Sequence, residues 1–260
     1  MSDSTQESIR RRHLERKRRR IIEMRRRRII TMSLLVLIIF CIIIFFTPIF
    51  KVRKIEIVGN EKVTVADITS KLEPCMGKNI FRFRTKKPIN NIKTIAYIDT
   101  VSIKKSPLKS KITVKVTECE PAAYIEVGEK NIVLDRNMKV LEIVETVEAE
   151  IPVIQDVTAS GVNLGAVVSL QNESTLNAVK TCIGEMADEG ILNGVKYISF
   201  KEIGNVTFNY QDRLDVKCGR IENFEKKIKI FNQAINSPKL TEKSRGTIDL
   251  STTGQAVYTP

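Results

Sequence analysis

The sequence predicts an α+β protein with a single N-terminal transmembrane helix and, after it, two domains that mix strands and helices. Two observations support this prediction. Residues 29–50 form an uncharged and strongly apolar run. The rest of the chain switches between stretches in which every second residue is apolar and stretches in which apolar residues recur every three or four positions. The first pattern is typical of strands and the second of helices, so both kinds of element alternate along the chain.

The apolar run is long enough to cross a bilayer. Its 22 residues would extend over about 33 Å as a helix, and the hydrocarbon core of a bilayer is roughly 30 Å thick. Residues 47–51, which end the run, do not form the small-residue site at which a signal peptide is cleaved. We therefore expect the segment to stay attached as a membrane anchor.

The flanking charges predict how the anchor is oriented. Residues 1–28 contain 12 Lys and Arg against four acidic residues, a net charge of +8, whereas only Lys51, Arg53 and Lys54 follow closely behind the run. The more positive flank stays in the cytoplasm. We expect a basic cytoplasmic tail over residues 1–28, a transmembrane helix over 29–50, and an extracytoplasmic remainder.

The basic tail is expected to contact anionic lipid. It lies next to the bilayer, where each Lys or Arg gains about 1 kcal/mol from anionic headgroups. An arginine-rich arm could also bind nucleic acid, but this one has no Phe, Tyr or Trp to stack on bases. No nucleic acid is therefore expected as a partner. The residues that set the topology are those next to the membrane, Arg25, Arg26, Arg27 and Arg28.

The composition excludes several kinds of active site outside the cytoplasm. The single histidine, His13, lies in the basic tail, so the outer domains cannot hold a Ser-His-Asp triad or a His-ligated zinc ion. No C-x-x-C spacing occurs, and we expect neither a metal nor a cofactor. Hydrolysis by two carboxylates remains an alternative, namely a membrane-anchored cell-envelope hydrolase, although no particular Asp or Glu pair stands out.

Four cysteines follow the membrane segment: Cys75, Cys119, Cys182 and Cys218. They could form two disulfides in three pairings, and the sequence leaves their state open. Cys218 continues the inward face of a strand pattern, which indicates a small buried apolar side chain.

Residues 51–120 predict a domain with the order strand, helix, helix, strand, strand. Two helices can cover one face of a three-stranded sheet and so close a small core. The first strand has Ile55 and Ile57 as its apolar positions, and the first helix has Val65, Ile68 and Leu72, with a capping box at Thr64 and Asp67. The second helix has Ile89, Ile92 and Ile95, with Pro88 near its start. The last two strands form a hairpin with the apolar positions Val101, Ile103, Ile112, Val114 and Val116.

Residues 121–250 predict a mixed β domain with helices, followed by a polar C-terminal tail over 251–260. Pro121 marks the boundary with the preceding domain. We expect two strands around Asp135-Arg136-Asn137 with Asn137 at positive φ, turns at Pro152, Gly161 and Gly165, and then a helix whose inward residues are Leu176, Val179, Ile183 and Met186. A hairpin follows, in which Val206, Phe208 and Tyr210 pair with Leu214, Val216 and Cys218.

The last two expected elements are a helix and a strand. The helix has Phe224, Ile228, Phe231 and Ile235 on one side and Lys226, Lys227 and Lys229 elsewhere, and in the strand Ile248 and Leu250 face together.

Several stretches in this order resemble the FtsQ/DivIB cell-division family. VRKIEIVGNEKVTVADI and KKSPLKSKITVKVTECEP resemble its POTRA domain, in which an E-R/K-x-P step usually ends the unit; here Cys119 replaces the base. LDVKCGRIENFEKKIKIFNQAI and GTIDLSTTGQAVYTP resemble its second domain. POTRA units also occur in transporters that insert outer-membrane barrels, but here the unit occurs once, follows a membrane helix and precedes no barrel-like repeat.

The resemblance implies a non-catalytic, single-pass scaffold of the division machinery in the cell membrane at the division septum. Its expected partners are membrane division proteins of the DivIC/FtsB and FtsL type, bound outside the cytoplasm so that septum formation is coordinated. We expect these partners to add a strand to an exposed sheet edge.

The terminal strand is the leading candidate for that edge, because a chain-terminal strand often lies at the side of a sheet. The lysine-rich hairpin of the first domain is a second candidate, with Lys104, Lys105, Lys111 and Lys115, although such lysines also protect an edge from aggregation. The predicted partner-binding residues are Thr247, Ile248, Asp249, Leu250 and Ser251 on the strand, and Lys226, Lys229 and Arg245 for charge contacts with an acidic partner.

Overall fold

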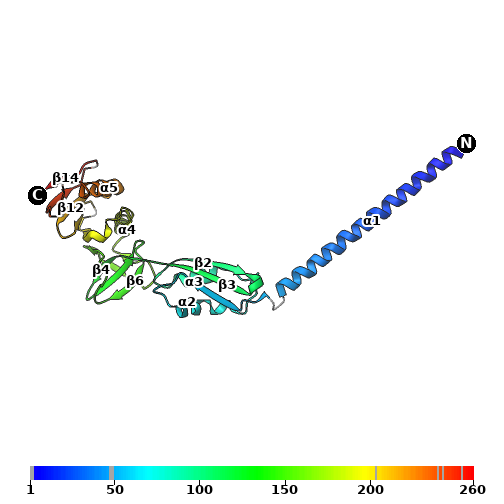
Figure 1. The fold of residues 1–260 in the computed structure, drawn as a ribbon, viewed down its shortest axis with the longest axis horizontal. Helices are drawn as coiled ribbons and strands as arrows, with labels where there is room; N and C mark the ends of the chain where they lie inside the picture. Colours follow the sequence, from blue (N-terminus) through cyan, green and yellow to red (C-terminus); the bar gives the residue numbers. More distant parts are fainter. Residues whose placement is uncertain (1–2, 47–49, 203, 239, 242, 253) are drawn as a thin grey trace. The chain divides into compact units, whose positions relative to one another are not determined.

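The computed structural model describes residues 3–46, 50–202, 204–238, 240–241, 243–252 and 254–260 (Figure 1). The chain divides into two compact units. The first comprises Met1–Ile55, Cys75–Arg84 and Lys105–Ile112, and the second comprises Glu56–Pro74, Thr85–Lys104 and Thr113–Pro260. The predicted domain boundaries at residues 50 and 120 do not coincide with this division and stay a prediction.

The chain begins with one long helix, α1, which runs from Asp3 to Phe46. Within it, the segment Glu23–Ile44 contains an 18-residue stretch with a mean hydropathy of 2.4 and no buried residues, and the segment is long and apolar enough to cross a membrane. The expected basic tail is therefore continuous with this helix, because Arg, Lys, Glu and Leu are good helix formers and an established helix propagates easily. Residues 47–49 of the predicted span lie outside the described residues.

The first domain has the predicted order of elements. Its strands are β1 (Lys54–Val58), β2 (Ile98–Ser106) and β3 (Lys111–Glu118), its helices are α2 (Val65–Leu72) and α3 (Lys86–Lys93), and short 3₁₀ turns occur at Glu73–Cys75 and Pro107–Lys109. The three strands form one sheet with the order β1-β3-β2. The predicted strand, helix, helix, strand, strand arrangement is confirmed.

The capping box at the start of α2 is also confirmed. The Thr64 hydroxyl accepts a hydrogen bond from the Asp67 backbone N–H at 3.1 Å and donates one to the Asp67 carboxylate at 2.7 Å. Ile68 and Leu72 are fully buried, but Val65 is 54% exposed, so its predicted place on the inward face is wrong. Val65 is the first residue of α2, and helical side chains lean toward the N-terminus, which directs this one past the end of the packed face.

The second domain is built on a nine-stranded sheet. Its strand order is β14-β13-β12-β11-β10-β7-β4-β5-β6. The strands are β4 (Pro121–Val127), β5 (Lys130–Asp135), β6 (Val140–Val144), β7 (Val153–Gln155), β10 (Val195–Ser199), β11 (Val206–Tyr210), β12 (Leu214–Gly219), β13 (Gly246–Asp249) and β14 (Val257–Thr259). A separate pair is formed by β8 (Ala159–Gly161) and β9 (Ser169–Leu170). Gly161 therefore lies in a strand and not in a turn as predicted.

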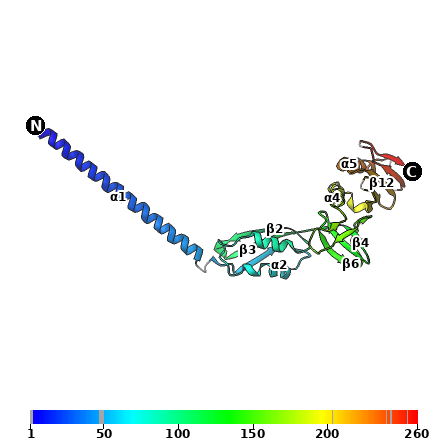
Figure 2. The same ribbon diagram turned by 180° about the vertical axis from the view of Figure 1, so that it is seen from behind.

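Two helices pack on this sheet. They are α4 (Glu173–Asp188) and α5 (Phe224–Ile235), and a 3₁₀ turn follows α4 at Leu192–Gly194. Phe231 of α5 makes edge-to-face contacts with Phe208 and Tyr210 of β11, with ring centroids 5.1 and 5.3 Å apart. In both views α5 lies beside β12 (Figures 1 and 2). The predicted inward faces of the two helices are confirmed, because Val179, Ile183 and Phe231 have no exposed surface.

The turn between β5 and β6 differs from the prediction by one residue. Met138, and not Asn137, has positive φ, at 65°. The Asp135 carboxylate accepts hydrogen bonds from the backbone N–H groups of Asn137 and Lys139, both at 2.8 Å. Three-residue hairpin loops commonly place their last residue in the left-handed region, and Met138 is fully buried there.

Lys227 is buried, although the pattern predicts it away from the packed side of α5. Its side chain is only 3% exposed. Its ammonium group donates hydrogen bonds to the carbonyl oxygens of Cys218 at 2.8 Å and Arg220 at 2.7 Å. A lysine can be buried when its charge is surrounded by acceptors in this way.

Candidate partner-binding surface

The sheet ends at β14, and not at the predicted terminal strand. β13 pairs with β12 in parallel on one side and with β14 in antiparallel on the other, with Ile248 opposite Tyr258. The predicted edge position of Thr247–Leu250 is therefore wrong. β14 has no signal in the sequence, because its three residues are too few to show alternation and the preceding Ser251, Thr252 and Gly254 resemble a polar tail.

The backbone of Tyr258 faces the open side of the sheet. Gly246 donates its N–H group to the carbonyl oxygen of Arg213, directly before β12, at 3.1 Å, and Leu250 donates to that of Lys217 in β12 at 2.8 Å. Backbone groups alternate in direction along a strand, so those of Thr247 and Asp249 face β14. Their partners there are Thr259 and Val257. The N–H and C=O groups of the intervening residue, Tyr258, consequently point outward.

The side chain of Tyr258 turns back onto the protein and lines a small apolar cavity. Its hydroxyl donates a 2.6 Å hydrogen bond to the carbonyl oxygen of Arg245. The cavity has a volume of about 210 Å³, which is below the roughly 300 Å³ of the smallest usual ligand pockets. It is therefore sized for a side chain and not for a cofactor. Its lining is Ala234, Ser237, Leu240, Ile248, Ala256 and Tyr258.

The predicted binding residues on β13 lie behind the open edge, which is formed by β14. Ile248 and Leu250 are 0% and 1% exposed, so their side chains belong to the core. The Asp249 carboxylate accepts a 2.8 Å hydrogen bond from the Ser251 backbone N–H. Hydrogen bonds from Ser251, together with the charge of Lys217, lower the pKa of Asp249. Thr247 pairs with Thr259, and Ser251 is exposed. Direct contact between these residues and a partner stays a prediction.

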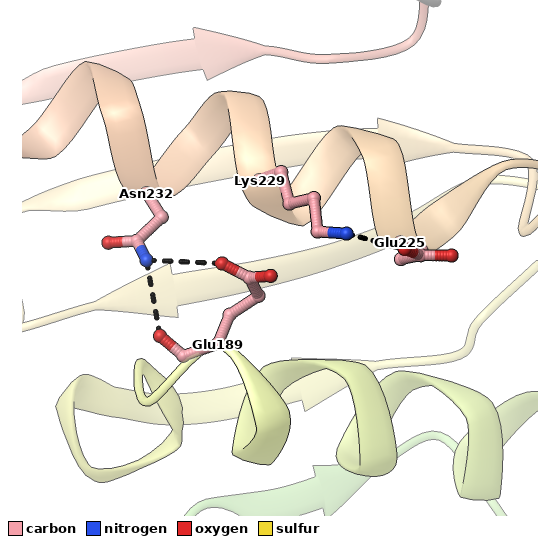
Figure 3. A network of polar contacts seen from close by, with 4 residues as sticks. All are labelled: Glu189, Glu225, Lys229 and Asn232. Atoms are coloured by element: carbon pink, nitrogen blue, oxygen red, sulfur yellow. Dashed lines mark hydrogen bonds and ion pairs between the residues drawn. The ribbon is translucent and has the colours of Figure 1, made fainter.

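The predicted basic residues have different surroundings. Lys229 donates to the Glu225 carboxylate at 2.5 Å, one turn earlier on α5 (Figure 3). Asn232, one turn later, donates to the backbone and side-chain oxygens of Glu189 at 3.1 and 3.3 Å. Lys226 and Arg245 are exposed. Of the three predicted cations, Lys229 is thus already engaged by a carboxylate, whereas the side chains of Lys226 and Arg245 face solvent.

The hairpin of the first domain offers a different edge. In the order β1-β3-β2, β3 is central, so Lys111 and Lys115 lie on an inner strand, and of the two hairpin strands only β2 lies at an edge of the sheet. On β2, the Lys105 ammonium group donates to the carbonyl oxygen of Phe83 and lies over its ring, 5.4 Å from the centroid. Lys104 is exposed and is placed to protect this edge.

An acidic cavity lies near the end of β3. Its volume is about 460 Å³, and Asp99, Glu118, Glu120 and Asp135 contribute to its lining. Glu118 accepts hydrogen bonds from the backbone N–H groups of Glu61, Lys62 and Val63 at 2.8, 2.8 and 2.9 Å.

The acidic cavity does not fit the carboxylate-hydrolase alternative. Burial alone would raise the pKa of Glu118, but the three N–H donors and the charge of Lys62 outweigh it and lower this pKa. A general acid needs a raised pKa. Asp135 is likewise occupied, with two backbone N–H groups of its own turn, so these carboxylates hold loops in place.

Comparison with known proteins agrees with the resemblance in the sequence. Residues 50–118 match the model of the FtsQ-type POTRA domain. The chain is 27% identical to the cell division protein DivIB of Clostridium botulinum over 243 residues, which cover 87% of this chain and 90% of that one. It is 25% identical to the cell division protein FtsQ of Corynebacterium glutamicum over 184 residues, 70% and 77% of the two chains.

A solved structure is also similar to part of the chain. It is the major extracytoplasmic domain of the trans isomer of the cell division protein DivIB from Geobacillus stearothermophilus. The match covers 47% of this chain and 96% of that one, with 18% sequence identity and a TM-score of 0.32.

Proposed function

As this chain is a member of the FtsQ/DivIB family of cell division proteins, we propose that it acts as a non-catalytic, single-pass membrane scaffold that holds other division proteins outside the cytoplasm. Two observations support a role in division: residues 50–118 match the FtsQ-type POTRA domain, and relatives of the chain are the cell division proteins DivIB and FtsQ. The apolar segment Glu23–Ile44 supplies the anchor. The basic residues at its N-terminal end, Arg25, Arg26, Arg27 and Arg28, keep the N-terminus in the cytoplasm and contact anionic lipid.

The observation that carries the proposal is the open edge of β14. A sheet edge offers unpaired backbone groups to an incoming strand. Here the outward groups belong to Tyr258, and Val257 beside it is 49% exposed. The apolar cavity on the α5 side receives a side chain of the added strand. The backbone of β14 therefore provides the affinity, and the cavity provides the specificity.

The partners that fit this edge are membrane division proteins of the DivIC/FtsB and FtsL type, acting at the division septum. A short extended segment of such a protein pairs with β14. Acidic residues in it are attracted by Lys226 and Arg245, which are exposed on α5 and directly before β13. The edge is held in position by the residues of β13 and those directly after it, through their pairing with β14, their buried side chains and the hydrogen bond between Asp249 and Ser251; they are Thr247, Ile248, Asp249, Leu250 and Ser251.

A proline at position 258 tests the outward backbone group directly. Full-length chain is purified in mild detergent from cells and the co-purifying division proteins are quantified by mass spectrometry. Tyr258→Pro removes both the ring and the outward N–H, whereas Tyr258→Ala removes only the ring. Edge strands accept proline where the N–H faces solvent, so both variants are expected to fold.

We expect Tyr258→Pro to lose DivIC-type and FtsL-type proteins much more completely than Tyr258→Ala does. If both variants retain them at the wild-type level, the partner binds another edge, such as β2. If no division protein accompanies the wild-type chain, the scaffold proposal is wrong.

A further inference from the structure

Three segments near the end of the membrane helix contain basic residues and no acidic ones. They are residues 50–55, 75–84 and 105–112, which belong to the same compact unit as α1, and we call the surface that they form the basic tip. Each of its three segments contains three Lys or Arg, nine in all, and none contains Asp or Glu. The cations are Lys51, Arg53, Lys54, Lys78, Arg82, Arg84, Lys105, Lys109 and Lys111.

Backbone hydrogen bonds hold the three segments of the basic tip together. Val52 donates its N–H to Lys78 at 2.9 Å and accepts one from Gly77 at 3.0 Å. The backbone N–H of Arg53 donates to Ser110 at 2.8 Å, which attaches the third segment. Phe50 and Phe81 stack edge to face with centroids 5.2 Å apart. The charges are therefore displayed on an ordered surface.

Apolar side chains project from the same surface. Leu108, at the turn between β2 and β3, is 95% exposed. Met76 and Phe81 on the neighbouring segment are 46% and 44% exposed. Exposed apolar side chains surrounded by cations are the pattern of proteins that bind at a membrane interface, where the apolar groups enter the headgroup region and the cations contact phosphates.

Covalent geometry keeps the basic tip close to the bilayer. Four residue steps separate the last residue of α1, Phe46, from Phe50, and they span at most about 14 Å. The Asn79 side-chain amide also donates a 3.0 Å hydrogen bond to the carbonyl oxygen of Ile44 in α1. A surface tied to the end of a membrane-spanning helix faces lipid headgroups before any other partner.

We propose that the basic tip docks on the headgroup layer of the leaflet at the extracytoplasmic end of α1, with Leu108 inserted at the interface and the cations bound to anionic phospholipid. The proposal rests on the membrane anchoring proposed above, and it adds a second lipid contact, on the opposite side of the membrane from Arg25–Arg28. It makes the basic tip lie at a fixed height on the bilayer.

This placement is compatible with the positive-inside orientation. That orientation is set as the unfolded chain inserts, by charges within about 15–20 residues of the membrane segment. Six of the nine cations lie at residues 78–111 and reach the membrane only after the domain has folded outside.

A single tryptophan tests the insertion of Leu108. The chain contains no Trp, so Leu108→Trp in the full-length protein gives an isolated fluorescent probe at a 95% exposed position where folding is not disturbed. The protein is reconstituted in phosphatidylcholine vesicles with or without phosphatidylglycerol, and quenching by lipids brominated along their acyl chains is measured. Leu164→Trp, at a 60% exposed leucine of the second unit, is the matched control.

We expect the Leu108→Trp fluorescence to be quenched several-fold more strongly than that of Leu164→Trp when phosphatidylglycerol is present. Adding Lys78→Glu, Arg84→Glu and Lys109→Glu should remove this difference, whereas Lys130→Glu, Lys180→Glu and Lys196→Glu, three exposed lysines of the second unit, should leave it unchanged. High salt should weaken the quenching as well, because it screens the cations.

Three results would overturn the proposal: absence of quenching at position 108, equal quenching at positions 108 and 164, or equal quenching with and without phosphatidylglycerol. None of these bears on partner binding, which is measured by co-purification through β14. The lipid proposal and the scaffold proposal therefore fail separately.

Discussion

A Cβ atom on Gly246 would lie 2.2 Å from the carbonyl oxygen of Thr259. This separation is much shorter than a van der Waals contact between carbon and oxygen. Gly246 also has a φ of +144°, a conformation that other residues adopt only under strain. The close approach of β14 to β13 thus requires glycine at this position, and the proposed docking edge depends on it.

Gly246→Ala is expected to detach β14. The strain and the clash together should destabilise the end of the sheet by on the order of 1–3 kcal/mol. The amount of co-purified division proteins should fall as well, because the edge proposed to bind them is displaced. Gly184→Ala is the control: it lies within α4 with no atom near the added carbon, and alanine there should stabilise the helix by up to about 1 kcal/mol. Thermal unfolding and partner recovery unchanged in Gly246→Ala would contradict this account.

Lys227→Met should destabilise the second domain. The substitution keeps the apolar stem but leaves the carbonyl oxygens of Cys218 and Arg220 without their ammonium donor. Unpaired buried acceptors cost about 1–3 kcal/mol. Lys226→Met, at the exposed neighbour, should change the free energy of unfolding by less than about 0.5 kcal/mol. Denaturant unfolding measures both; equal stabilities would show that the two hydrogen bonds contribute little.

The features that the sequence predicts correctly have local signals. The hairpin of β11 and β12 combines two alternating runs with a short turn, and Phe208 lies opposite Val216 as expected. The inward face of α5 follows from the spacing of Phe224, Ile228 and Phe231, all buried. In the first domain, the capping box at Thr64 fixes the start of α2. Each of these elements follows from neighbours within about ten residues.

The features that the sequence does not predict depend on distant segments. β14 is a strand only because β13 offers it an edge, and its three residues show no pattern of their own. Lys227 is buried because two carbonyl groups at the end of β12 happen to face it. The basic tip arises when three separate segments converge, so its charge density is invisible in any one of them. The proposed partner-binding edge and the proposed lipid-binding surface can therefore be recognised only in the folded chain, and not in the sequence.

Three of the four cysteines after the membrane segment, Cys119, Cys182 and Cys218, should be unreactive thiols in the folded chain. Burial raises the pKa of Cys218 to about 12, with Lys227 opposing this effect and Asp249 adding to it. Burial also raises the pKa of Cys119 to about 12, with Asp135 adding to it, and burial raises the pKa of Cys182 well above its usual value. Because the thiolate is the reactive form, a maleimide at about pH 8 should label none of the three.

The labelling experiment includes its own positive control. A cysteine introduced at the exposed Ser102 should react within minutes, and denaturation without a reductant should make the buried thiols reactive. Mass spectrometry counts the modified residues. A pair that stays unlabelled after denaturation would reveal a disulfide, in contrast to the free thiols in the described structure.

Glu118 should contribute stability that depends on pH. Its pKa is lowered below the usual 4.5 in the folded chain, so folding favours its charged form. The contribution is therefore fully present above about pH 4.5 and is lost as the pH falls through the folded pKa. Glu118→Gln removes the charge that holds the N–H groups of Glu61, Lys62 and Val63, and it should lower the free energy of unfolding at about pH 7.

The difference between wild type and Glu118→Gln should shrink as the pH is lowered, because the wild-type carboxylate becomes neutral as well. Denaturant midpoints measured from neutral to acidic pH test this, with Glu120→Gln at the exposed neighbouring carboxylate as the control. A constant difference across that range would mean that Glu118 acts through its shape and not its charge. A difference in stability that shrinks toward acidic pH would mean that the charge of Glu118, the last residue of β3, holds the loop after β1 in place. That is a structural reason for a glutamate at the position where the POTRA unit ends.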